Sequence, residues 1–249
     1  MKSIRILQTK VNLLTIDQLH NKLTEFIKSD KKAIVDYLNI YSANLAVENK
    51  WFADFLNLCD IVLCDGKGIQ LSAFLLKQKV PQQIPYNRWL WEFFSFCEEK
   101  QYSIFFLGSK PGVVDKTIEN IKNKGYNIVM NGHHGYFKKE GDENVKVIET
   151  INKLKPDFLI VGFGMPLQEK WLIENHELIN AKVTILGGAY LDWISGDVKV
   201  PPQIVSKIGI EWFYRLVLEP QRLAGRYLVG IPQFFFRIMK QKINNGVYR

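Results

Sequence analysis

The chain has 249 residues, of which 47% are apolar and 23% charged, and its formal net charge is +8. That apolar content is enough for a full core, which excludes a disordered chain. Nine Lys/Arg but only two Asp/Glu follow Val198, so the positive charge is concentrated in the tail. The three cysteines lack CxxC spacing, which argues against a disulfide framework and against a zinc knuckle.

In chain order, helical patterns alternate with short, nearly continuous apolar runs. The first helix starts after Thr15 and extends to about Ser29. Strands are predicted at 33–38, 61–64, 103–108, 127–130, 157–161 and 182–187. Apolar strands that alternate with helices are typical of a largely parallel sheet covered on both faces, so the predicted class is α/β.

Glycines follow most of these strands at the end where parallel sheets bind ligands. They include Gly108, Gly162, Gly164 and Gly187, and the stretch GFGMPLQEKW has the strand, glycine turn and proline of a phosphate-binding loop. This repetition suggests several loops around one nucleotide-like or phosphate-bearing ligand. Glycine also ends strands for ordinary turn reasons, so that alternative stays open.

The composition changes near residue 198, where Pro201-Pro202 marks a hinge. We therefore predict a core at 1–197 and a basic appendage of three short helices at 198–249. Phe234, Phe235 and Ile238 share an apolar side beside basic residues, which predicts contact with a membrane surface that contains anionic lipid. In the alternative interpretation these side chains pack on the core. Because no run of eighteen apolar residues occurs and the N-terminus lacks a signal-peptide pattern, a cytoplasmic location is expected.

Asp65 directly follows the strand at 61–64, where the scaffold would hold it as a general base; the alternative is a cap on the next helix. Arg222 and Arg226 are four residues apart and should share a helix face, with Arg215 one helix earlier. Guanidinium groups of this kind suit a diphosphate, although a solvated role is the alternative.

The sequence also lacks several motifs that would indicate other functions. It contains no DxD pair for a metal-bound nucleotide diphosphate and no complete GxGxxG, which disfavours a nicotinamide or flavin enzyme. His133-His134 reads as a loop without a third metal ligand. No metal and no cofactor are therefore expected.

Five segments together resemble the WecG/TagA/CpsF glycosyltransferases, known as glycosyltransferase family 26. They are VLCDGKGI, FFLGSKPGV, PDFLIVGFGMPLQEKW, ILGGAYLDWISGDVKVPP and GIEWFYRLVLEPQRLAGRY, and they span roughly residues 5 to 230. The resemblance implies a Rossmann-like core whose C-terminal appendage completes the active site on the membrane. It also implies an inverting, metal-independent enzyme of bacterial envelope polysaccharide synthesis. Such an enzyme moves a hexose-type sugar from a UDP donor to a saccharide linked to polyprenyl diphosphate at the cytoplasmic membrane face.

By position, the resemblance makes Asp65 the catalytic base and casts Asn39 and Gln168 as groups that orient sugar or acceptor. Arg215, Arg222 and Arg226 would meet the diphosphate, aided by backbone N–H groups of the glycine loops. A structural role for the two amides is the alternative.

The stretch PQQIPYNRWL departs from the family pattern at Gln83, Tyr86 and Arg88, and Tyr37 stands where a small hydroxyl residue is usual. These changes leave the donor open among hexose, N-acetylhexosamine and uronate, and Arg88 is either a contact for an acidic sugar or a solvated side chain. They also motivate a second hypothesis, a catalytically degenerate relative that binds lipid-linked saccharide or UDP. Nucleic-acid binding by the basic, aromatic tail is disfavoured, because its charge lies on Phe-rich amphipathic helices.

Overall fold

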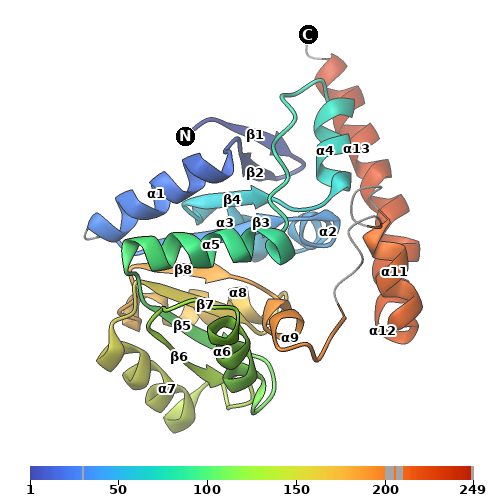
Figure 1. Ribbon diagram of the computed structural model, residues 1–249. Helices are drawn as coiled ribbons and strands as arrows, with labels where there is room; N and C mark the ends of the chain where they lie inside the picture. Colours follow the sequence, from blue (N-terminus) through green and yellow to red (C-terminus); the bar gives the residue numbers. More distant parts are fainter. Residues whose placement is uncertain (30, 200–204, 206–209, 248–249) are drawn as a thin grey trace. The chain divides into compact units, whose positions relative to one another are not determined.

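The structure is a computed structural model that describes residues 1–29, 31–199, 205 and 210–247. The chain divides into two compact units (Figure 1). Unit 1 comprises Met1–Thr15, Tyr37–Pro85 and Val200–Arg249, and unit 2 comprises Ile16–Asp36 and Tyr86–Lys199. The expected hinge at Pro201-Pro202 lies outside the described residues, so the boundary between core and appendage stays a prediction.

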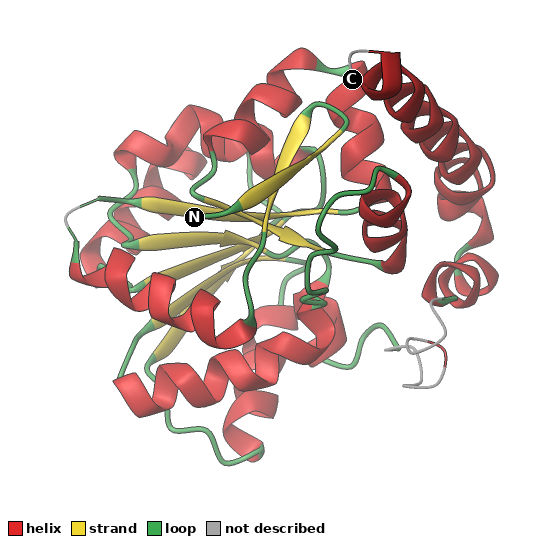
Figure 2. Ribbon diagram, turned by 90° about the horizontal axis from the view of Figure 1, so that it is seen from above, coloured by secondary structure: helices red, strands yellow, loops and turns green. Residues whose placement is uncertain are grey.

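Six strands form one sheet in the order β4-β3-β8-β7-β5-β6, and helices surround it (Figure 2). The pairs β3–β8, β8–β7, β7–β5 and β5–β6 are parallel, which confirms the predicted α/β class. The strands are β3 Ala33–Leu38, β4 Ile61–Cys64, β5 Ile104–Gly108, β6 Met130–His134, β7 Phe158–Gly162 and β8 Val183–Leu186. Four of them, β4, β5, β7 and β8, are buried along their whole length, as their continuous apolar sequences require.

The strand predicted at 127–130 was wrong in position, because β6 begins at Met130 and runs to His134. His133 and His134 therefore end a strand instead of lying in a loop. β6 is the last strand of the sheet and pairs only with β5, so its side chains remain partly exposed. An edge strand can be polar, and an apolar pattern does not locate it.

Unit 2 contains most of the helices that alternate with the strands of the six-stranded sheet. They are α1 Ile16–Lys28, α5 Tyr86–Lys100, α6 Val113–Asn123, α7 Gly141–Leu154, α8 Leu167–Asn175, the 3₁₀ turn η1 His176–Leu178 and α9 Tyr190–Ile194. Most connect one strand to the next, so the strand-end loops that carry Gly108, Gly162 and Gly187 all precede helices.

Unit 1 contains the C-terminal helices and a two-stranded antiparallel sheet. The sequence analysis missed this small sheet. The elements of unit 1 are β1 Ser3–Ile6, β2 Thr9–Asn12, α2 Ile40–Glu48, α3 Lys50–Leu58, α4 Lys67–Leu75, α11 Glu211–Leu218, α12 Pro220–Ala224, the π-helical segment η2 Gly225–Val229 and α13 Gly230–Val247. Pro220 occupies the first turn of α12, as predicted. The last helix, however, has 18 residues and is not short.

The apolar side of α13 differs from the predicted one. Phe234 and Ile238 are fully buried, and α13 packs against α2 within unit 1. Assigning these two residues to a membrane face was therefore wrong, because they cover the interior of the unit. Among the side chains of α13 that the structure describes, the exposed large apolar ones are Phe236, Met239 and Ile243, at 62%, 43% and 62% exposure.

Candidate active site

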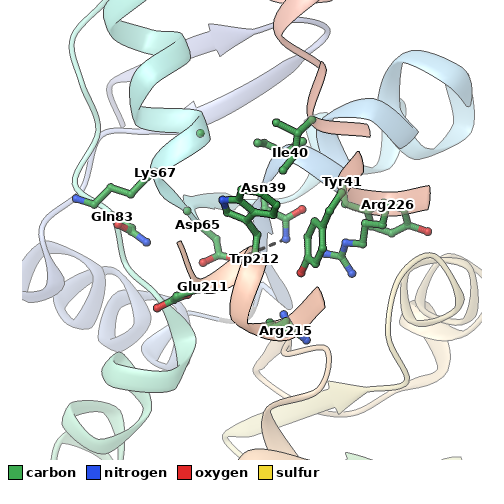
Figure 3. A pocket seen from close by; sticks show the side chains of 14 residues that line it. Asn39, Ile40, Tyr41, Asp65, Lys67, Gln83, Glu211, Trp212, Arg215 and Arg226 are labelled. Carbon is green, nitrogen blue, oxygen red and sulfur yellow. Dashed lines mark hydrogen bonds between the residues drawn. The ribbon is translucent and has the colours of Figure 1, made fainter. Parts of the chain in front are cut away.

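A pocket in unit 1 gathers side chains that follow two strands and others from the C-terminal helices (Figure 3). Its volume is about 150 Å³. Because one water needs roughly 10–15 Å³ of such space, it holds on the order of ten waters, comparable to one sugar ring. The lining residues are Asn39, Ile40, Tyr41, Asp65, Gly66, Lys67, Gly68, Gln83, Glu211, Trp212, Arg215, Arg226, Tyr227 and Ile231.

Asp65 follows the last residue of β4, and its backbone N–H donates to the carbonyl oxygen of Leu38 at 2.9 Å. This hydrogen bond holds Asp65 beside the end of β3. The N-cap of α4 is Gly66, so Asp65 does not cap that helix. The scaffold thus directs the carboxylate into the pocket and gives it no helix-capping task.

Burial raises the pKa of Asp65 to about 6. The hydrogen bond from Asn39 and the charges of Arg215 and Arg226 act in the opposite direction, while the negative charge of Glu211 raises the pKa further. A carboxyl group with this pKa is mostly ionised at neutral pH and holds a proton more firmly than an exposed aspartate. Both properties suit a general base.

Asn39 is held by the first turn of α2. Its side-chain Oδ1 accepts a hydrogen bond from the backbone N–H of Ser42 at 3.0 Å, and the Ser42 hydroxyl oxygen accepts from the backbone N–H of Asn39 at 2.8 Å. This capping box leaves the Nδ2 group free to donate to Asp65 Oδ2 at 3.4 Å. Asn39 and Asp65, predicted separately as site residues, are therefore in contact.

The three predicted arginines do not all line the pocket. Arg215 and Arg226 line the pocket, whereas Arg222 makes a two-pronged ion pair with Glu219, at 2.6 and 2.8 Å. The guanidinium carbon of Arg226 lies 4.2 Å from the centre of the Tyr41 ring. Its Nε atom is buried without a hydrogen-bond partner among the described residues, and burial lowers the pKa of the group. A desolvated cation of this kind favours an anionic ligand.

Gln168 lies in the first turn of α8 in unit 2 and is fully buried. Its Oε1 accepts from the backbone N–H of Gly188 at 3.1 Å, and its Nε2 donates to Glu169 Oε1 at 2.8 Å. Both ends of the amide thus serve the interior, which agrees with the structural alternative. Contact between Gln168 and a sugar stays a prediction.

Glu169 was not singled out in the sequence, although it is fully buried beside Gln168. Burial raises the pKa of Glu169 to about 7, and its Oε2 atom has no hydrogen-bond partner among the described residues. The sequence offered no clear signal for it, because the buried residues of α8 include Gln168 and Asn175 as well as Trp171 and Leu172.

The predicted glycines of unit 2 divide into two kinds. A Cβ atom on Gly108 would lie 2.5 Å from the Gly162 carbonyl oxygen, one on Gly162 would lie 2.7 Å from the Gly188 carbonyl oxygen, and one on Gly187 would lie 2.2 Å from the Tyr190 ring. These three are required for close packing of neighbouring loops. Gly164 instead has φ of +82° and no atom within 4 Å of the added Cβ, so its backbone borders open space.

Of the residues that depart from the family pattern and whose side chains the structure describes, only Gln83 lines the pocket. Tyr86 is buried in unit 2, where its ring packs edge-on against Trp89 with centroids 5.4 Å apart. The backbone of Arg88 belongs to α5, but its side chain lies outside the described part of the structure. The predicted sugar contact of Arg88 therefore stays a prediction.

Sequence reasoning also missed several pocket residues, among them Tyr41, Glu211 and Trp212. Glu211 precedes Arg215 by four residues, a spacing that indicates a shared helix face. Across the described ranges, no group of three or more His, Cys, Asp or Glu side chains is placed to hold a metal ion. No described helix combines the length and the apolar character that crossing a bilayer requires.

Comparison with known proteins places the chain among the glycosyltransferases. It belongs to the WecG/TagA/CpsF glycosyl transferase family, because the sequence model of that family matches residues 4–247. It is 30% identical over 237 residues to the N-acetylglucosaminyldiphosphoundecaprenol N-acetyl-beta-D-mannosaminyltransferase of Staphylococcus aureus strain MRSA252, and equally similar to the protein of that name from strain NCTC 8325 / PS 47. Each alignment covers 95% of this chain and 88% of the relative.

Proposed function

We propose that this glycosyltransferase moves a hexose-type sugar from a UDP-sugar to a saccharide linked to polyprenyl diphosphate, with inversion and without a metal ion. The names of the two relatives support the acceptor class, because both act on N-acetylglucosaminyldiphosphoundecaprenol. The observation that carries the proposal is Asp65, a carboxylate with a raised pKa that shares a pocket with two arginines.

In the proposed mechanism, Asp65 removes the proton from an acceptor hydroxyl. The oxygen attacks the anomeric carbon of the donor from the face opposite UDP, the bond from that carbon to UDP breaks, and the configuration inverts. Asn39 donates a hydrogen bond to Asp65 Oδ2 and orients the carboxylate. The pKa of about 6 predicts that the rate falls as the pH is lowered through that value, because the base becomes protonated.

Arg215 and Arg226 would stabilise the negative charge that develops on the departing UDP. Two guanidinium groups in a partly desolvated pocket supply positive charge where other enzymes use a divalent cation. A backbone N–H contact from Gly164 in unit 2 to the nucleotide stays a separate prediction, supported by the open space beside that residue. Metal independence is tested by adding EDTA, which should leave the rate unchanged.

We propose further that the enzyme acts at the inner face of the cytoplasmic membrane without spanning it. The stripe of Phe236, Met239 and Ile243 recurs along one side of α13, and Lys240 lies over the Phe236 ring at 4.7 Å. Lys240 and Lys242 flank the stripe, which suits a membrane that contains anionic lipid.

Vesicle sedimentation tests this surface. A Phe236→Ser, Ile243→Ser double variant should bind vesicles with anionic lipid about tenfold more weakly than wild type, since each lost apolar group reduces insertion. Leu178→Ser in unit 2 is a matched control, because Leu178 is also 62% exposed. Equal binding of the double variant and wild type would remove the support for this surface.

The donor is tested by UDP release from a panel of UDP-linked hexoses, N-acetylhexosamines and uronates, with a short-chain polyprenyl-diphosphate-GlcNAc acceptor in detergent. One donor should give release that depends on acceptor and that Asp65→Asn abolishes. A protein that binds UDP but turns over no donor with a widened acceptor panel would instead be a catalytically degenerate relative.

A further inference from the structure

Helix α11 presents two chemically different sides. At about 100° per residue, Glu211, Trp212 and Arg215 fall on one side, and Phe213 and Val217 fall on the other. The first three line the pocket, whereas Phe213 and Val217 are 52% and 64% exposed. The helix therefore separates the pocket that contains Asp65 from an apolar outer surface.

On the pocket side, Glu211 and Trp212 accompany the base. Glu211 interacts electrostatically with Asp65, and Trp212 lines the same cavity with 36% of its surface exposed (Figure 3). The Trp212 ring is steadied by edge contacts with Phe213 and Tyr227, with centroids 5.8 and 6.1 Å away. Neither residue takes up the proton or stabilises UDP in the proposed mechanism, although the charge of Glu211 raises the pKa of the base.

An exposed indole beside a carboxylate is suited to binding a sugar. The axial C–H groups of a pyranose form an apolar face that packs on the electron-rich face of an aromatic ring. A carboxylate accepts hydrogen bonds from the equatorial hydroxyl groups at the edge of the same sugar. The cavity of about 150 Å³ has room for one such ring.

We propose that Trp212 and Glu211 form the subsite for the acceptor sugar, with Trp212 against its apolar face and Glu211 on its hydroxyl groups. The inference rests on the proposed function, in which Asp65 must touch an acceptor hydroxyl. It is the acceptor, not the donor, that is joined to lipid, and α11 carries apolar Phe213 and Val217 on the side away from the pocket.

Steady-state kinetics with both substrates varied test the subsite. Trp212→Ala should raise the KM for the acceptor about tenfold and leave the donor KM within about twofold, as expected for the loss of one stacking contact. Trp212→Phe should recover most of that loss, because it keeps an aromatic face. Trp51→Ala is the matched control, since Trp51 lies on α3 with 39% exposure and does not line the pocket.

Glu211→Gln provides a second readout. The charged groups that act on Asp65 are Glu211, Arg215 and Arg226, and removing the single negative one should shift the acidic limb of the rate profile to lower pH, together with a higher acceptor KM. A structural role alone would move neither value, and thermal unfolding of each variant reports whether it folds.

Binding of a short-chain GlcNAc-diphosphate-prenol by calorimetry separates this inference from the proposed function. Weaker binding by Trp212→Ala supports the subsite even if no UDP-sugar turns over in wild type. The subsite is overturned if Trp212→Ala binds acceptor as wild type does, if wild type does not bind it, or if the donor KM rises in place of the acceptor KM.

Discussion

The pocket of unit 1 and the strand-end loops of unit 2 carry the same kind of sequence signal, but the structure explains them differently. In unit 1, Asp65 and Arg226 are desolvated charges at a cavity, and Arg226 Nε makes no hydrogen bond among the described residues. In unit 2, Gly108 and Gly162 lie against neighbouring backbone, and Gln168 uses both ends of its amide within the fold.

A residue at the end of a parallel strand can thus be there for ligand or for packing. The distinguishing property is whether the residue has polar atoms without a partner in the protein, or open space beside it. By that criterion, Asp65, Arg226 and Gly164 are available to a ligand, while Gly162 and Gln168 are occupied by the protein. The comparison predicts that substitutions at the pocket of unit 1 mainly lower activity, whereas substitutions at the packed loops of unit 2 mainly lower stability.

The largest effect is expected at the base. Asp65→Asn should lower kcat/KM by about a hundredfold or more, because the amide cannot accept the proton. Asp54→Asn is a suitable control, since Asp54 pairs with the exposed Lys50 and does not line the pocket. UDP release under saturating donor measures the effect, and a variant that keeps more than a third of wild-type activity would exclude Asp65 as the base.

The next largest effect is expected from a comparison of substitutions at Arg226 and Arg222. Arg226→Lys keeps the charge but loses the planar group over Tyr41, and we expect about a hundredfold lower kcat, a typical loss for one electrostatic contact in the transition state. Arg222→Lys should stay within about threefold, because Arg222 is paired with Glu219. If both variants lost activity equally, the division of the arginines by the pocket would be incorrect.

Substitutions at Gly162 and Gly164, two residues apart, should differ in their effect on stability. Gly162→Ala should lower the free energy of unfolding by about 2–4 kcal/mol, because its Cβ would meet the Gly188 carbonyl oxygen. Gly164→Ala should cost only about 1 kcal/mol for its positive φ and should weaken UDP binding more. Urea unfolding and UDP titration of both variants measure the two effects. Equal destabilisation would contradict the distinction.

The smallest expected effect is a gain in stability at Asp65. A buried carboxyl whose pKa is raised to about 6 stabilises the fold fully below its unfolded pKa and loses that contribution as the pH rises to 6. At about pH 8, the free energy of unfolding of Asp65→Asn should therefore exceed that of wild type by roughly 1–2 kcal/mol. Thermal unfolding at a series of pH values measures this difference, which should vanish at about pH 4. A constant difference across this range would show that the ionisation of Asp65 is not its cause.

The sequence predicted most of the sheet because four of its strands, β4, β5, β7 and β8, are buried along their whole length and have continuous apolar sequences. β3 and β4 begin and end where their apolar runs do, and Asn39 and Asp65 follow from their positions after those strands. The polar edge strand β6 was misplaced, and the hairpin of β1 and β2 was missed, because its short strands mix charged and apolar residues.

The arginine set could not be resolved by spacing. Residues four apart align on a regular helix, but the π-helical segment Gly225–Val229 begins between Arg222 and Arg226. Its wider turn changes the direction of the side chains that follow, so Arg226 lines the pocket and Arg222 does not. Nothing in the composition of that stretch distinguishes a π turn from an α turn.

The side-chain amide of Asn39 makes two contacts that serve different purposes. Its oxygen caps α2, and this fixes which end of the group faces the carboxylate. Aspartate would keep the cap but set two negative charges against each other, and serine would keep the cap but withdraw the donor from Asp65. A screen for thermal resistance and a screen for turnover would therefore accept different substitutions at this position, and only asparagine would pass both.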